Sequence, residues 1–340
     1  MVRYNYQALF VVLCGAFATA FILSATNKVA SSIPSQYGIS SVGVASQRVV
    51  LDKHRGTDNS DPAGWRKFVV SQKTFETPEV ASIVLTPSSG KPTLPFKPGQ
   101  FLGLRIDFGE QAVRRKYSLS RADNGRNYTI SVKKEEDGLI SGYLHDELSI
   151  GQTIDIYTPG GAFTLDFSAA NAKPIVLLTA GIGISPIMSM VEEIVRNPIY
   201  TNRPVHFIHC ARTRKLHPFR AFLQRLHLAR PNFKYYIAYS QDAPFVKSSH
   251  SATTATEANL EATVEAEATE VRYGRLTEQH LRDWLPTDRD AEVYFLGPVP
   301  FMARVKRALV KLGVPAAQLH WEFFSKKLGK DLDAIVTEDL

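Results

Sequence analysis

Arg115, Lys116, Tyr117 and Ser118 are consecutive residues whose types and order could do chemistry in this 340-residue chain. An arginine offers a planar fork of donors to a diphosphate, and a tyrosine two residues later can lie flat against an aromatic ring system. A neighbouring serine can hydrogen-bond a ring nitrogen. An ordinary edge strand with a solvated arginine would carry the same residues, so this motif alone leaves both interpretations open.

A second candidate site contains Gly138 and Ser141, which precede the expected helical run GYLHDEL at residues 142–148. Glycine permits a sharp turn, and the first amides of a helix present unpaired N–H groups to an anion. The alternative is a plain helix start that is capped by Ser141.

Two glycine turns come directly after expected buried strands. Residues 179–186 read TAGIGISP and residues 296–302 read LGPVPFM. Gly181 and Gly183 would let the backbone approach a pyrophosphate, and Pro186 suits a first helical turn. The third glycine of the dinucleotide fingerprint is absent, so a simple strand-to-helix connection is the alternative.

A basic run, ARTRK, follows the expected strand at residues 205–211. The adenosine ribose of a dinucleotide would lie at this edge of a parallel sheet. Arg212 and Arg214 would then offer cations to a 2′-phosphate, or else belong to a solvated turn.

Two kinds of scaffold are needed to position these residues. Short β-forming runs separated by Pro, Gly, Asn and Asp predict an antiparallel barrel or sandwich; they occupy residues 67–75, 80–87, 100–108, 116–122, 127–134 and 153–159. Beyond residue 173, buried strands alternate with helices, which predicts a doubly wound parallel sheet. The expected strands are 174–180, 205–211, 233–239 and 292–297, and the expected helices are 187–196, 219–229 and 300–313.

We predict four segments. Residues 1–60 form an apolar anchor or targeting segment with a linker, and residues 61–170 form the barrel. Residues 171–326 form the α/β domain with a low-complexity insertion near 242–270, and residues 327–340 form a tail.

The composition excludes several functional classes. The chain has 40 Lys and Arg against 33 Asp and Glu. Three of the basic residues lie in the first 51 residues, which contain no acid, and the remainder is too nearly neutral to indicate nucleic-acid binding. With only two cysteines, Cys14 and Cys210, neither a disulfide framework nor a cysteine-ligated iron–sulfur site can be built. We predict no metal site.

An apolar run at residues 8–25 has about the length needed to cross a bilayer. A cleaved signal, a single-span anchor and an import sequence all fit it, and we favour the anchor or the import sequence. The predicted location is therefore membrane-associated, with the catalytic part in the cytosol or an organelle matrix. A mitochondrial membrane is favoured over the endoplasmic reticulum.

The order of these motifs, from about residue 64 to residue 325, resembles the ferredoxin–NADP reductase superfamily. It is most similar to the reductase portion of flavohaemoglobins, without the globin domain. The matching segments are GWRKFVVSQK, FKPGQFLGL, RKYSLSRA, SVKKEEDGLISGYLHDEL, IGQTIDI, TAGIGISPIMSM, GRL, GPVPFMARVKRAL and LGVPAAQLHWEFFS.

The resemblance implies an FAD-dependent NAD(P)H oxidoreductase with an antiparallel FAD-binding barrel and a nucleotide-binding α/β domain. Arg115 would bind the FAD diphosphate, Tyr117 would pack on the isoalloxazine, and Ser118 would bond near the reactive flavin nitrogen. Tyr117 and Ser118 are the predicted catalytic residues. The other predicted residues for FAD and for NADH or NADPH are Phe101, Lys116, Gly138, Ser141, Gly181, Ile182, Gly183, Ile184, Ser185, Pro186, Arg212, Arg214, Gly297, Pro298, Phe323 and Phe324; Glu322 belongs to the same closing segment.

Two departures from the family keep a different function open. Leu296 stands where the family often has a cysteine, and Ser325-Lys326 replaces a Gly-Pro. A catalytically weakened nucleotide-binding or redox-sensing partner subunit is therefore the alternative. The residues before the barrel hold a single histidine, His54, and cannot encode a globin haem pocket. We expect the electron acceptor to be another chain, such as a small haem protein of the kind that cytochrome b5 reductases use, or a small molecule.

Overall fold

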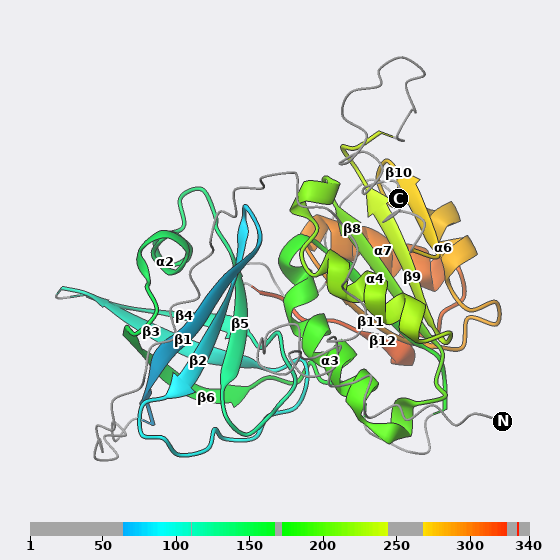
Figure 1. The fold of residues 1–340 in the computed structure, drawn as a ribbon. Coiled ribbons are helices and arrows are strands. Elements are labelled where there is room, and N and C mark those ends of the chain that lie inside the picture. The colour runs from blue at the N-terminus through cyan, green and yellow to red at the C-terminus, as the bar shows by residue number, and fades with distance from the viewer. Residues whose placement is uncertain (1–63, 110, 167–171, 244–267, 325–331, 333–340) are drawn as a thin grey trace, which may run out of the picture. The chain divides into compact units, whose positions relative to one another are not determined.

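The computed structural model describes residues 64–109, 111–166, 172–243, 268–324 and 332, which all belong to one compact unit, residues 54–340 (Figure 1). The predicted segment 1–60 lies outside the described residues. So do most of the low-complexity insertion and all of the tail except Leu332.

The first half of the described chain is a six-stranded antiparallel sheet in the order β4-β3-β6-β1-β2-β5. Its strands are β1 (Arg66–Thr77), β2 (Val80–Pro87), β3 (Phe101–Phe108), β4 (Gln111–Ser118), β5 (Tyr128–Lys133) and β6 (Thr153–Gly160). A bridge between Leu119 and Ile130 joins the chain beyond β4 to β5, so the two edges of the sheet meet as in a barrel. Helix α2 (Leu139–Gly142) and the π-helix η2 (Tyr143–Glu147) pack Ile140 and Leu144 on the barrel core.

Strand β4 differs from its prediction. We expected residues 116–122, whereas the strand covers Gln111–Ser118. The middle of the strand consists of the charged, exposed Arg114 and Arg115, which interrupt the alternation typical of a strand. The pairing of β4 with β3, from Gln111 opposite Phe108 to Ser118 opposite Phe101, provides the backbone hydrogen bonds that make it one.

The second half is a six-stranded parallel sheet in the order β10-β9-β8-β7-β11-β12. Its strands are β7 (Ile175–Ala180), β8 (Val205–Ala211), β9 (Phe233–Tyr239), β10 (Glu270–Tyr273), β11 (Glu292–Leu296) and β12 (Leu319–His320). The strand order reverses between β7 and β11, because β8 continues on one side of β7 while β11 lies on the other. The carboxyl ends at such a reversal are where open α/β sheets bind ligands. The predicted fold class, antiparallel barrel followed by doubly wound parallel sheet, is confirmed.

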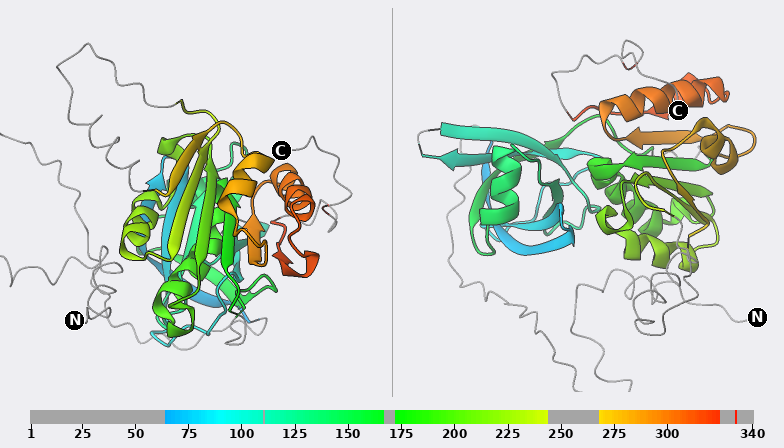
Figure 2. Two further views of the ribbon diagram at one scale, coloured as in Figure 1. Left: turned by 90° about the vertical axis from the view of Figure 1, so that its right-hand side faces the viewer. Right: turned by 90° about the horizontal axis from the view of Figure 1, so that it is seen from above.

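Helices cover both faces of the parallel sheet (Figure 2). Residues Ile175 and Leu177 of β7 pack with α3 and α4, whereas Val176 and Leu178 pack with α6 and α7. This alternation is the period of a strand that is buried on both faces. The helices are α3 (Ile184–Arg196), α4 (Arg220–Ala229), α6 (Glu278–Trp284) and α7 (Val299–Lys311), with short 3₁₀ turns η3 (Gly181–Gly183), η4 (Pro198–Tyr200), η5 (Arg214–Leu216) and η6 (Ala316–Gln318).

One side of helix α3 fixes the barrel against the parallel sheet. Ser185 Oγ donates to the carbonyl of Ser131 in β5 at 3.1 Å, and Ser189 Oγ accepts from the amide of Gly99 at 2.8 Å. Glu192 accepts from the amide of Ala122 at 3.0 Å and pairs with Arg121. Residues 185, 189 and 192 follow helical spacing, so one helix side makes all three contacts. The site residues of the barrel are thereby held beside the nucleotide turns.

Candidate functional site

A cavity of about 390 Å³ lies where β4 and β5 of the barrel approach the start of α3. The predicted residues Arg115, Lys116, Tyr117 and Ser118 all line it. Its other lining residues include Ser131–Lys133, Glu135, Gly138–Ser141, Ile182, Ser185 and Phe324. Two of the motifs predicted for flavin binding, together with residues from the glycine turn and the closing segment, therefore meet around one cavity.

Tyr117 and its neighbours differ in exposure. Burial raises the pKa of Tyr117 to about 12, so its hydroxyl keeps its proton at neutral pH and remains a donor. Arg115 and Lys116 are exposed, and Arg115 donates to the carbonyl of Arg114 at 2.8 Å. Phe101 pairs with Ser118 across β3 and β4 and lies 4.1 Å below the Lys116 ammonium, but it does not line the cavity.

Gly138 begins a tight turn that Ser141 closes. The hydroxyl of Ser141 donates to the carbonyl of Gly138 and accepts from the amide of Glu135, both at 3.1 Å. A Cβ on Gly138 would lie 2.2 Å from that hydroxyl, so a larger residue here would displace the Ser141 side chain from its two hydrogen bonds. No side chain caps α2, which differs from the alternative of a helix capped by Ser141.

A larger cavity of about 810 Å³ lies at the carboxyl ends of β7, β8 and β11. It is lined by Ala180–Gly183, Cys210–Arg212, Leu216, Pro218, Ala238, Ser240, Gly274–Leu276, Gly297–Phe301, Arg304 and Phe324, and by Thr77, Glu79, Val80, Lys133 and Glu135 of the barrel. Burial raises the pKa of the Cys210 thiol to about 12, so this cysteine presents a neutral group to the cavity.

Three glycines shape the two βα turns of this cavity. Gly181 has φ +53°, a conformation that favours glycine. A Cβ on Gly183 would lie 2.4 Å from the carbonyl oxygen of Leu296, and a Cβ on Gly297 would lie 2.8 Å from the ring of Phe301 and 3.0 Å from Cβ of Ala180. Glycine at 183 and 297 is what allows the two turns to approach each other, whereas Gly181 provides the backbone conformation of its own turn.

The two cavities share part of their walls. Lys133, Glu135, Ile182 and Phe324 line both. Phe324 has 54% of its surface exposed, so its ring is available to a ligand on either side. Phe323, by contrast, packs on the core of the parallel sheet, and it does not line these cavities.

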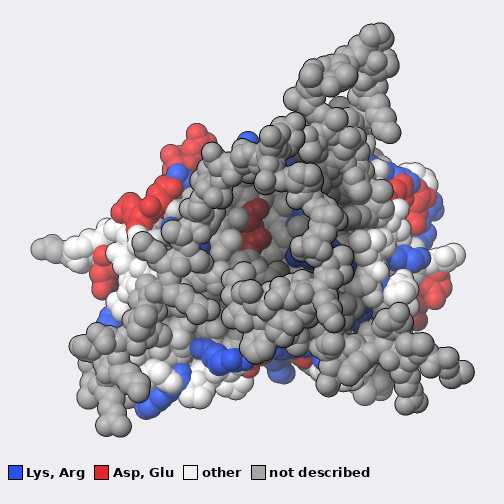
Figure 3. Space-filling view, viewed as in Figure 1, with Lys and Arg blue, Asp and Glu red and all other residues white. Residues whose placement is uncertain are grey.

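The basic residues of the larger cavity differ from those predicted. Arg212 lines it and forms an ion pair with Glu79 of the barrel. Arg214 does not line it, because its guanidinium bonds the hydroxyl of Tyr273 and lies 3.7 Å from Asp242. Side chains of both charges are visible in the hollow near the middle of the view in Figure 3.

Arg275 and Arg304 also line the larger cavity, and sequence reasoning missed both. Arg275 belongs to the matched GRL segment, and Arg304 lies in the first turns of α7 after the Gly297 turn, so position relative to these motifs could have indicated them.

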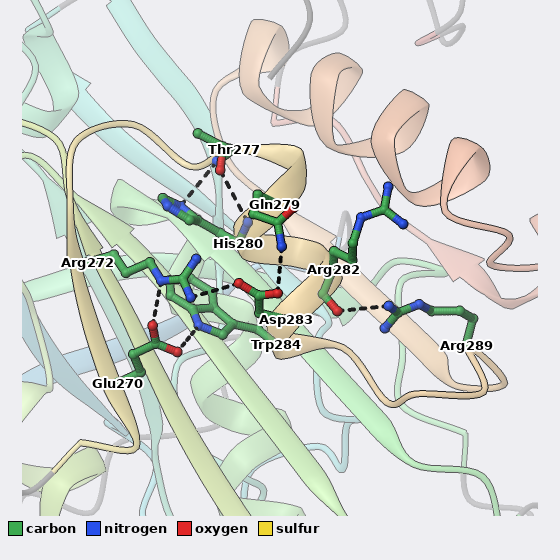
Figure 4. Close-up of polar contacts among 9 residues, drawn as sticks. All are labelled: Glu270, Arg272, Thr277, Gln279, His280, Arg282, Asp283, Trp284 and Arg289. Atoms are coloured by element: carbon green, nitrogen blue, oxygen red, sulfur yellow. Dashed lines mark hydrogen bonds and ion pairs between the residues drawn. The ribbon is translucent and has the colours of Figure 1, made fainter.

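Strand β10, which leads to Arg275, is positioned by a polar cluster with α6 (Figure 4). Arg272 pairs with Glu270 and with Asp283, and Glu270 accepts from the indole Nε1 of Trp284 at 2.7 Å. The guanidinium of Arg272 lies 5.4 Å from the Trp284 ring. These contacts hold a four-residue edge strand whose own sequence gave no strand prediction.

Comparisons with known proteins agree with this architecture. The family model of the oxidoreductase FAD-binding domain matches residues 67–165, and that of the oxidoreductase NAD-binding domain matches residues 177–307. A flavohemoprotein of Pseudomonas aeruginosa is 42% identical over 271 residues, which cover 79% of this chain and 62% of the relative. A flavohemoprotein of Rhodopirellula baltica is 36% identical over 317 residues, which cover 89% of this chain and 71% of the relative.

A solved structure gives the same result. The flavohem-like FAD/NAD-binding domain of nitric oxide dioxygenase from Vibrio cholerae has a TM-score of 0.63 and 28% identity, with 76% of this chain and 97% of that chain covered. This chain spans about three fifths of the length of the Pseudomonas flavohemoproteins that it matches.

The fold and the two adjoining cavities therefore define an oxidoreductase with an FAD-binding and a NAD(P)-binding domain. More particularly, the chain belongs to the flavohemoprotein family and carries the FAD/NAD-binding reductase module of that family. The predicted cofactors, FAD and NADH or NADPH, are those of this class.

The predicted localisation is wrong. The similar flavohemoproteins come from bacteria, which contain no mitochondria, so a mitochondrial membrane is contradicted. Within the described ranges, no helix is long and apolar enough to cross a bilayer. The membrane prediction rested on residues 8–25, which lie outside those ranges.

Proposed function

We propose that this protein transfers hydride from NADH or NADPH to FAD and passes the electrons on to a separate acceptor. The observation that carries the proposal is the shared wall of the two cavities at Lys133, Glu135, Ile182 and Phe324. Hydride transfer needs the two ring systems in contact, and a shared wall between a flavin cavity and a nucleotide cavity provides that arrangement.

The residues of the smaller cavity fit FAD. Two exposed cations, Arg115 and Lys116, match a diphosphate in charge, and the tight turn at Gly138 brings backbone close to the cavity. The protonated hydroxyl of Tyr117 and that of Ser118 can both donate hydrogen bonds. We propose residues 61–170 as the FAD-binding domain and residues 171–326 as the nucleotide-binding domain.

When bound, FAD accepts a hydride and releases electrons singly or as a pair. The protein's own residues are proposed to orient the two ring systems. Tyr117 and Ser118 are proposed to position the flavin, while Ile182 and Phe324 provide apolar surface at the shared wall.

We propose a haem protein as the acceptor, with a small molecule as the alternative. Support comes from the names of the relatives, which are flavohemoproteins, and from this chain's match to the reductase part of them.

The test uses the purified full chain under anaerobic conditions. The protein should carry the absorption of an oxidised flavin, lose it when NADH or NADPH is added, and then reduce ferricyanide and a small b-type cytochrome. Flavin that stays oxidised in excess NADH and NADPH would refute the reductase function and support a nucleotide-binding partner subunit instead. Reduction of ferricyanide without reduction of the cytochrome would refute the haem acceptor alone.

A further inference from the structure

Glu79 of the barrel lines the larger cavity, which is called the nucleotide cavity below. It lies in the turn between β1 and β2, where the hydroxyl of Thr77 accepts from the amides of Glu79 at 3.2 Å and Val80 at 3.1 Å. The carbonyl of Glu79 accepts from the amide of Lys134 at 2.8 Å. These contacts tie the turn to the end of β5, so the barrel fixes the backbone of Glu79 at the edge of the cavity.

The carboxylate of Glu79 forms an ion pair with Arg212, which follows β8. Its other oxygen lies 4.0 Å from the ammonium of Lys133, which in turn lies 3.6 Å from Glu135. Glu79, Arg212, Lys133 and Glu135 all line the nucleotide cavity. Glu79 is therefore an acidic group at the place where the sequence predicted only cations.

The end of β8 is where a dinucleotide on the Gly181–Gly183 turn would place its adenosine ribose. In sheets of this kind, a carboxylate at the ribose accepts from the 2′-hydroxyl of NAD, and an arginine there accommodates the 2′-phosphate of NADP. The turn after β8 reads Arg-Thr-Arg-Lys and contains no carboxylate of its own.

We propose that Glu79 is a specificity-determining residue that makes NADH the preferred nucleotide, by occupying Arg212 and by repelling a 2′-phosphate. The inference rests on the proposed function, because it assigns the substrate of that same site. The carboxylate comes from the FAD-binding barrel and reaches the ribose position only because α3 docks the two sheets together.

The other arginines do not replace Arg212 at this position, and Lys133 already faces both Glu79 and Glu135. Arg214 contacts Tyr273 and Asp242 and does not line the cavity. Arg275 follows β10, which is two strands away from β8, a separation of about 10 Å at ordinary strand spacing. Arg304 lies in α7, on the far side of the reversal of strand order from β8.

The test measures the affinities of NAD⁺ and NADP⁺ by calorimetry on the full flavin-loaded chain. The unmodified protein should bind NAD⁺ more tightly than NADP⁺. In Glu79→Gln, removal of the repulsion and release of Arg212 should shift the ratio of affinities about tenfold or more toward NADP⁺. Arg212→Ala should shift it in the opposite direction, because Glu79 then faces the phosphate with only the more distant Lys133 to compensate its charge.

Glu136→Gln is the matched control. Glu136 is an exposed carboxylate in the segment after β5, and it lines neither cavity. Its ratio of affinities should stay within about twofold of the unmodified protein. Equal or tighter binding of NADP⁺ by the unmodified protein, an unchanged ratio in Glu79→Gln, or an equal shift in Glu136→Gln would overturn the proposal.

Binding and turnover are separate readouts. A protein whose NAD⁺ preference depends on Glu79 but whose flavin is not reduced would refute the proposed reductase function and leave the role of Glu79 supported. A protein that reduces its flavin but prefers NADPH, or whose preference does not depend on Glu79, would support the reductase function and refute the role of Glu79.

Discussion

Adding one methyl group at Gly183 should disable the nucleotide site. The Cβ of an alanine there would lie 2.4 Å from the carbonyl oxygen of Leu296, 2.6 Å from its carbonyl carbon and 2.8 Å from the amide nitrogen of Gly297. Leu296 is 1% exposed and pairs with Thr179 of β7, so its carbonyl has little freedom to move. The Gly181–Gly183 turn must shift instead.

Carbon atoms of side chains essentially never lie closer than 3.0 Å to such a neighbour, so the turn has to move by about 0.6 Å or more. Overpacking of this kind typically costs about 1–3 kcal/mol of stability. A displacement approaching 1 Å at a substrate-positioning element can cost up to about a hundredfold in rate. We therefore expect kcat/KM for NADH to fall by about tenfold to a hundredfold in Gly183→Ala.

The matched control is Gly181→Ala in the same turn. A Cβ on Gly181 meets nothing within 4 Å, but its φ is +53°, so only the backbone preference of alanine is tested, at a cost of about 1–2 kcal/mol. Urea unfolding and steady-state kinetics with NADH separate the two effects. A Gly183→Ala protein with unchanged stability and KM, or a Gly181→Ala protein with the larger loss of kcat/KM, would refute the argument from close packing.

Three further predictions concern the flavin site and the pH dependence of stability. Arg115→Ala and Tyr117→Ala should each weaken FAD retention about tenfold on gel filtration, whereas Arg114→Ala, whose side chain faces the ring of Trp65 outside the cavity, should retain it; equal retention by all three would contradict the site. Burial would raise the pKa of Asp155, but hydrogen bonds from Lys67 at 3.0 Å and Arg105 at 2.9 Å lower it below its ordinary value of 3.8. Loss of these charge-assisted hydrogen bonds in Asp155→Asn should lower the free energy of unfolding by about 2 kcal/mol at pH 7. The difference should shrink as the pH falls below 3.8, because there the unfolded chain takes up a proton that the native carboxylate does not; a difference that does not depend on pH would count against the ion pairs. Burial lowers the pKa of His209 to about 3 and that of His217 well below 6.5, so the native protein keeps both neutral while the unfolded chain protonates them. The free energy of unfolding should not depend on these two histidines above pH 6.5, and it should fall by about 1.4 kcal/mol per pH unit for each histidine as the pH drops below that value. A free energy of unfolding in urea that stays constant between about pH 7.5 and 5.5 would show that these histidines are not held neutral.

Several elements could be predicted from the sequence because local patterns dictate them. The strands β2, β8 and β9 have the predicted bounds, since each is a mostly apolar, β-forming run. Helix α3 begins three residues earlier than predicted, because Ile184 to Pro186 continue the glycine turn directly into the helix. Strand β10 and helix α6 were not predicted, because β10 is short and half-buried and is held by the contacts of Arg272 and Trp284.

The candidate site likewise contains residues that the sequence could predict and residues that only tertiary contacts bring to it. The glycines at 181, 183 and 297 and the Arg115–Ser118 motif are local features, readable because turns and phosphate cradles demand particular residue types at fixed spacing. The partner of Arg212 is not readable, since Glu79 lies 133 residues away in the chain. Only the docking of α3 through Ser185, Ser189 and Glu192 brings the two together, and that contact depends on shapes and hydrogen bonds formed between separately folded sheets rather than on any local preference of the chain.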